Sequence, residues 1–295
     1  MIVLFETSLL FKTMIILSGQ LGIVLATCVY CIKRARTAYE NNSTFLGISF
    51  RASMNMKKKL DLVPYTPIPD QYPVEMTKSV ELEKPTWSVS KYEILKKVAM
   101  NKEQRLEFLK EGFTDVNKNY SILYLFLSWA ALLFACLYFS VSEISTITGI
   151  FLFSAQSIAF GPLLALIMLE MDENDGFKAL QIVFLVTIAT GVIGYSDIYS
   201  FSESAYLASF LFISLLGLIV FGFIRIFIGF SRKTVRVKAI FGAFIFTLFL
   251  LYDFNYLKKS AELGFNNWET AFSIAFTLYL DIVNLLLEIL DAMSN

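Results

Sequence analysis

Residues 121–141, SILYLFLSWAALLFACLYFSV, contain no charged side chain over 21 positions. A helix that crosses a bilayer needs about 20 mostly apolar residues, so this run predicts a membrane span. Six other runs support the same prediction, and together they indicate an all-α, polytopic transmembrane helix bundle with about seven spans. Four of them, 13–32, 144–169, 179–196 and 204–224, carry no charge, and two, roughly 236–257 and 270–290, are interrupted by Asp253 and Asp281.

The composition agrees with a membrane protein and shows one polar insertion. Hydrophobic residues make up 56% of the chain and charged residues 17%, with 25 basic and 25 acidic side chains. Segment 33–118 holds 16 Lys and Arg against 11 Asp and Glu, a net charge of +5, which leaves −5 for the rest. This small basic excess is mixed with acid, so we do not expect binding to nucleic acid.

Three parts are expected along the chain: an N-terminal transmembrane anchor at 1–32, the polar insertion at 33–118 and a transmembrane bundle at 119–295. Segment 61–87 of the insertion holds five of the six prolines and is expected to be an extended, Pro-rich strap. The following segment, 90–113, has apolar residues at helical spacing and begins with the capping pattern Ser90-x-x-Glu93. It predicts an amphipathic helix that binds a protein partner or packs on the bundle itself.

The absence of histidine excludes histidine-based catalysis, metal ligation and pH switching. Cys28, Cys31 and Cys136 lie in uncharged runs and are expected to pack as small apolar side chains. We expect no cofactor and no permanently bound metal. Small residues in 155–161 predict close helix approach, and Pro162 is expected to kink its span.

Asp253 and Asp281 each interrupt one of the last two hydrophobic runs. Since an ionised carboxylate is costly in hydrocarbon, such residues face the bundle interior, pair with another group or take up a proton. The two runs are joined by a short loop and are expected to be antiparallel neighbours, so the two carboxyl groups can face each other and share a proton. The same pair could hold a calcium ion transiently, because calcium prefers oxygen ligands.

A purely structural role for these aspartates is the alternative. Asp253 could reach interfacial water, and Asp281 could hydrogen-bond Asn284, Tyr279 or a broken backbone. Arg225 is the only basic residue near the interior of a span. Its long side chain is expected to extend towards the membrane interface.

The segments around the aspartates carry a family resemblance. FLLYDFNYLKKSAE (249–262) and TLYLDIVNLLLEIL (277–290) resemble the last two helices of the Bax inhibitor family of multi-pass proteins. AFGPL (159–163) resembles that family's Gly-Pro signature. The resemblance covers about 115–295, and FLLYD with the downstream Lys-x-Ala-Glu is most similar to the mitochondrial growth-hormone-inducible transmembrane branch.

The resemblance implies a slow, pH-sensitive calcium leak across an internal membrane, associated with suppression of cell death. It implies that Asp253 and Asp281 form the pH-sensing gate. It also favours the mitochondrial inner membrane, with the endoplasmic reticulum or another internal membrane as the alternative.

The chain departs from the family pattern in its number of spans. The family core has seven helices, whereas six spans follow residue 115. If 121–141 is the first core helix and 144–169 the third, the second is missing, and with it a basic residue that pairs with the aspartates in some members. In a second alignment 13–32 is the first core helix and 33–118 is inserted before 121–141.

These departures leave a second function open: a non-transporting accessory subunit of a large mitochondrial inner-membrane complex, such as one of the respiratory chain. We do not expect an enzyme. Intramembrane aspartyl proteases use Tyr-Asp and Gly-x-Gly-Asp motifs, and Tyr252-Asp253 matches the first, but Leu280-Asp281 lacks the glycines of the second.

Overall fold

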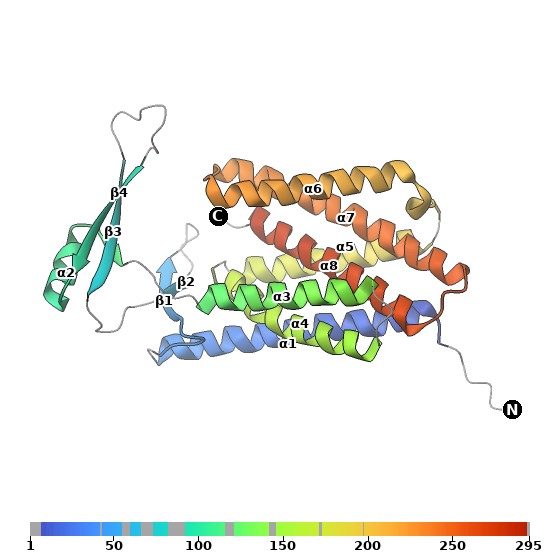
Figure 1. Cartoon of the computed structure of the whole chain (residues 1–295), viewed down its shortest axis with the longest axis horizontal. Coiled ribbons are helices and arrows are strands. Elements are labelled where there is room, and N and C mark those ends of the chain that lie inside the picture. Colours follow the sequence, from blue (N-terminus) through green and yellow to red (C-terminus); the bar gives the residue numbers. More distant parts are fainter. Residues whose placement is uncertain are drawn as a thin grey trace. The chain divides into compact units, whose positions relative to one another are not determined.

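The computed structural model describes residues 7–41, 43–54, 60–65, 73–81, 92–115, 121–141, 146–170, 173–196 and 198–293 (Figure 1). The chain divides into two compact units, which are described separately. The first unit comprises Met1–Arg34, Ala52–Val63 and Tyr124–Asn295, and the second comprises Ala35–Arg51 and Pro64–Leu123.

The first unit is a bundle of long apolar helices. Seven helices in the described part of the chain are long and apolar enough to cross a membrane, which confirms the predicted bundle. The chain is therefore an integral membrane protein. Its helices are α1 (Leu9–Glu40), α3 (Ser121–Val141), α4 (Thr146–Glu170), α5 (Glu173–Tyr195), α6 (Ala205–Phe227), α7 (Arg232–Glu262) and α8 (Trp268–Met293).

The last two spans form an antiparallel hairpin, and local sequence signals set its ends. The hydroxyl of Ser231 accepts a hydrogen bond from the backbone N–H of Thr234 and caps the start of α7. Gly264 follows the end of α7 with a φ of +84°, a conformation that glycine adopts without strain. Helix α8 is the most buried of the seven and lies inside the bundle (Figure 1).

Small residues bring α1 against α4, as the 155–161 pattern predicts. A Cβ atom on Gly161 would collide with the side chain of Thr27. Next to Thr27, the Cys28 Sγ lies 3.7 Å from the Met168 Sδ, so this cysteine packs between α1 and α4. Helix α4 continues through Pro162 from Thr146 to Glu170.

The second unit contains a three-stranded antiparallel sheet in the order β4-β3-β5. Strand β3 (Val74–Glu81) pairs along its whole length with β4 (Tyr92–Ala99), from Val74 opposite Ala99 to Glu81 opposite Tyr92. Strand β5 (Thr114–Asp115) pairs on the other side of β3. Val74, Met76, Ala99 and Phe113 form its small core.

The predicted amphipathic helix over 90–113 is wrong in its first half. Residues 92–99 form strand β4, and the helix α2 is confined to Lys102–Lys110. Pairing with β3 satisfies the backbone groups of this segment, and such tertiary pairing overrides the apolar spacing that suggested a helix. The N-cap is Asn101, whose side chain accepts from the Gln104 N–H, while Ser90 lies outside the described residues.

The Pro-rich segment 61–87 is only partly within the described residues. Apart from Pro73, its described residues belong to strands β2 (Leu60–Tyr65) and β3, so they are extended but hydrogen-bonded into sheets. Strand β2 pairs with β1 (Ser49–Met54) in a separate two-stranded sheet. Residues 66–72 and 82–87 of the expected strap lie outside the described part.

Candidate functional site

The two intramembrane aspartates meet in the contact between α7 and α8. Both side chains are buried, and the two carboxyl groups lie within hydrogen-bonding reach of each other. The Oδ2 atom of each is buried and has no hydrogen-bond donor among the described residues. Two carboxylate groups are acceptors only, so a close approach of this kind is stabilised when one group carries a proton that it donates to the other.

The spans that pack on this hairpin place their own charges at their ends. Helices α4 and α5 pack against α7 or α8, and their charged residues lie only at 170 and at 173–178. Helix α6 contacts α7, and its one charged residue is Arg225. Tyr252 adjoins Asp253 in sequence, and Tyr279 is two residues from Asp281 on α8. The carboxyl pair therefore lies in an apolar part of the bundle.

The other residues singled out from the sequence do not join this pair. Tyr279 is buried on the side of α8 that faces α4, where it lies near Ser157 and Gln156. Asn284 is half-buried, and no hydrogen bond in the described part of the chain joins it to either aspartate. Arg225 binds Asp291, with its Nη1 atom 2.8 Å from the Asp291 Oδ2.

Asn255, two residues after Asp253, ties α7 to its neighbours. Its Oδ1 atom accepts hydrogen bonds from the N–H and the hydroxyl of Ser202, at 2.9 and 2.8 Å. Its Nδ2 atom donates to the Gly194 carbonyl on α5 at 3.1 Å. These bonds fix the rotation of α7 close to Asp253, so Asn255 has a structural role here.

A second polar group links α1 to α4. The Gln20 side chain donates to the Ser154 hydroxyl and accepts from the Ser157 hydroxyl, each at 3.0 Å. About two turns earlier on α1, Lys12 donates to the Asn266 carbonyl at 2.9 Å, in the loop between α7 and α8. Both contacts were missed from the sequence, because single glutamines and lysines in a span have no spacing signature.

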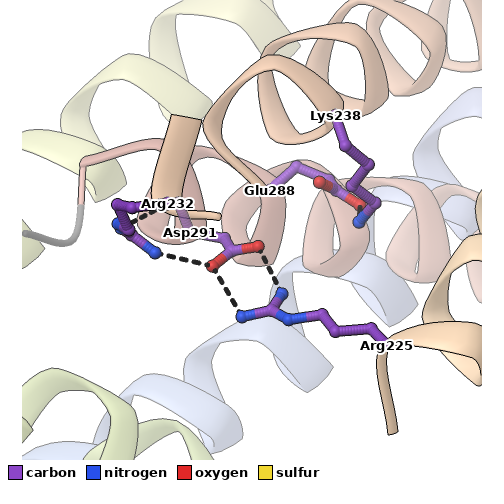
Figure 2. Close-up of polar contacts among 5 residues, drawn as sticks. All are labelled: Arg225, Arg232, Lys238, Glu288 and Asp291. Atoms are coloured by element: carbon purple, nitrogen blue, oxygen red, sulfur yellow. Dashed lines mark hydrogen bonds and ion pairs between the residues drawn. The ribbon is translucent and has the colours of Figure 1, made fainter. Parts of the chain in front are cut away.

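Five charged residues form what we call the α6–α8 charge cluster: Arg225, Arg232, Lys238, Glu288 and Asp291 (Figure 2). Asp291 lies between Arg225 and Arg232, and Glu288 faces Lys238 with Nζ and Oε1 2.5 Å apart (Figure 2). Glu288 was missed in the sequence analysis. The available signal was its spacing, because it follows Asp281 by seven residues and so lies on the same face of α8.

Seven long apolar helices among the described residues, with a buried carboxyl pair in the final hairpin, define a polytopic integral membrane protein. The family model "Inhibitor of apoptosis-promoting Bax1" matches residues 107–295 of this chain. The chain therefore belongs to the Bax inhibitor family. Helix α1 lies before the matched region, although it packs on the bundle.

A curated relative supports this assignment. The chain is 30% identical to Protein LIFEGUARD 1 of Arabidopsis thaliana over 122 residues, which are 39% of this chain and 50% of the relative. The match thus spans half the length of that relative, so the activity of the whole relative does not transfer directly.

Proposed function

We propose that this protein is a proton-regulated calcium leak in an internal membrane, gated by Asp253 and Asp281, and that it has no catalytic role. The observation that carries the proposal is the buried contact between the two carboxyl groups across the α7–α8 hairpin. Membership of the Bax inhibitor family supports a transport function, because the resemblance implies one.

The gate follows from the electrostatics of the pair. With one shared proton the two groups attract each other and hold α7 against α8. Loss of that proton places two like charges in contact within an apolar region, where they repel strongly. The helices then separate, and the exposed pair of carboxylates provides oxygen ligands for calcium. We therefore expect calcium flux to increase as the pH is raised.

Liposomes containing the purified protein test this prediction by calcium flux measured over a pH series. Asp253→Asn and Asp281→Asn keep the size of the side chain and provide an amide donor, so each replaces the shared proton by a permanent hydrogen bond. We expect both variants to lose the pH dependence of the flux. Wild-type pH dependence in both variants would rule out the aspartate gate.

We propose the mitochondrial inner membrane as the location. The support is the similarity of the FLLYD segment and the downstream Lys-x-Ala-Glu to the mitochondrial branch of the family. Localisation of the tagged protein by fractionation tests this, with the endoplasmic reticulum as the competing outcome.

The second unit favours a second candidate function, that of an accessory subunit in a large membrane complex. Strand β4 and the residue after it expose Ile94, Leu95, Val98 and Met100, with exposed fractions of 61%, 41%, 49% and 63%. A run of exposed apolar side chains on one short segment is typical of a protein-binding surface. Stoichiometric co-purification with other proteins in mild detergent would support this function, and purification as a monomer would contradict it.

A further inference from the structure

Helix α8 carries a second buried carboxylate in line with the aspartate pair. Glu288 follows Asp281 by seven residues, or two turns, which places it about 10 Å further along the same face of the helix. Asp281 faces Asp253 and Glu288 faces Lys238, so both carboxyl groups lie in the contact between α7 and α8.

The Glu288 carboxyl group is pressed against α7 at a glycine. A Cβ atom on Gly242 would lie 2.5 Å from the Glu288 Cδ and 2.8 Å from its Oε2. Glu288 is 8% exposed. Its Oε1 accepts from the Lys238 Nζ, whereas its buried Oε2 has no hydrogen-bond partner among the described residues. The carboxylate therefore keeps one oxygen available for a ligand.

The rest of the charge cluster, Asp291 with Arg225 and Arg232, is more exposed and is held by more hydrogen-bond donors. Asp291 accepts from Arg225 at 2.8 and 3.5 Å, and the Arg232 side chain donates to the Asp291 backbone carbonyl at 2.9 Å. Both arginine side chains are more than a third exposed. The guanidinium groups hold Asp291 through several donors, whereas Lys238 holds Glu288 through one flexible ammonium group.

We propose that Glu288 is a second cation-binding site of the leak, occupied in this structure by the Lys238 ammonium group, which calcium displaces during transport. The proposal rests on the proposed function for the identity of the ion. A buried carboxylate needs a compensating positive charge, so whatever replaces the ammonium group must be a cation. Calcium meets this need with oxygen ligands, and the unpaired Oε2 supplies one of them.

Flux measurements distinguish two roles for the Lys238–Glu288 pair: an ion pair that only stabilises the fold, and a cation site that lysine occupies. If the pair is only structural, Lys238→Met and Glu288→Gln disturb the same contact and change the flux in the same direction. If Lys238 competes with calcium, Lys238→Met increases the flux severalfold and Glu288→Gln decreases it. The double variant then behaves like Glu288→Gln, because the site itself is gone.

Calcium binding is tested independently of flux by the melting temperature of the purified protein, measured in calcium and in a chelator. Calcium should raise the melting temperature of the Lys238→Met protein, because a ligand that binds the folded state stabilises it. Calcium should raise the melting temperature of the double variant less. The difference between the two increases in melting temperature measures binding at Glu288, because both proteins keep the aspartate pair. If Lys238→Met does not fold, Lys238→Gln serves, because its amide still donates to the carboxylate without adding charge.

Lys258→Met is the matched control, since Lys258 also lies on α7 and pairs with a carboxylate, Glu262, at 3.2 Å, but both side chains are more exposed than those of Lys238 and Glu288. It should change neither flux nor the response to calcium. The inference is overturned if calcium stabilises the Lys238 variants no more than the double variant, whatever the flux. If the wild-type protein shows no calcium flux but calcium raises the melting temperature in a Glu288-dependent way, the leak function is refuted and the cation site is still supported.

Discussion

At the scale of single residues, the contact between α7 and α8 depends on one glycine and three acidic residues. Gly242 allows the Glu288 carboxyl group to lie against the backbone of α7, and Asp253 meets Asp281 further along. The sequence identified the two aspartates because charges interrupt apolar runs there. It could not identify Gly242, because glycine is common in membrane helices and its role depends on the side chain opposite.

Gly242→Ala is expected to destabilise the hairpin by about 1–3 kcal/mol, since the added methyl group would overlap the Glu288 carboxyl group. The melting temperature of the purified protein measures this effect. Gly217→Ala on α6 is the control, because nothing lies within 4 Å of its added Cβ. The control should not lower the melting temperature, and an equal loss in both variants would contradict the prediction.

At the scale of elements, the spans were predictable and the short elements of the insertion were not. Each span follows from a long, mostly apolar run, which is a local property of the sequence. Strand β4 follows from pairing with β3, which lies across a connection of ten residues, 82–91. The apolar spacing of a short segment does not show whether such a partner strand exists, so the helix expected there was wrong over 92–99.

The packing of α1 on α4 gives a prediction at this scale. Gly161→Ala is expected to push the two helices apart, because its Cβ would collide with Thr27, and to lower the melting temperature. Gly22→Ala on α1 is the matched control, since nothing lies within 4 Å of its added Cβ. Similar melting temperatures for the two variants would show that the α1–α4 contact contributes little.

At the scale of the whole molecule, α1 completes the bundle from outside the matched family region. In the described part of the chain, six spans lie within residues 107–295, and α1 joins them through Gln20, Thr27 and Lys12. The chain thus reaches seven spans by using a helix that precedes the polar insertion. That α1 is the first core helix, as in the second alignment, stays a prediction.

The chain should therefore stay assembled after a cut between α1 and the bundle. With a protease site placed between residues 55 and 59, we expect both fragments to co-elute in mild detergent. Gln20→Leu with Gly161→Leu should release the N-terminal fragment, because it removes the polar contacts and blocks the close approach. Separate elution of the unmutated fragments would contradict a stable seven-helix unit.

The sequence by itself determined that this is a membrane protein with seven apolar helices, that it resembles the Bax inhibitor family, and that Asp253 and Asp281 interrupt its last two spans. These properties depend on runs of neighbouring residues, and the cost of a charge in hydrocarbon makes them visible. Only the tertiary structure decided that the aspartates touch, that Glu288 meets Lys238 and Gly242, and that residues 92–99 form a strand. These contacts join residues far apart in the chain, and they depend on the rotation and pairing of whole elements.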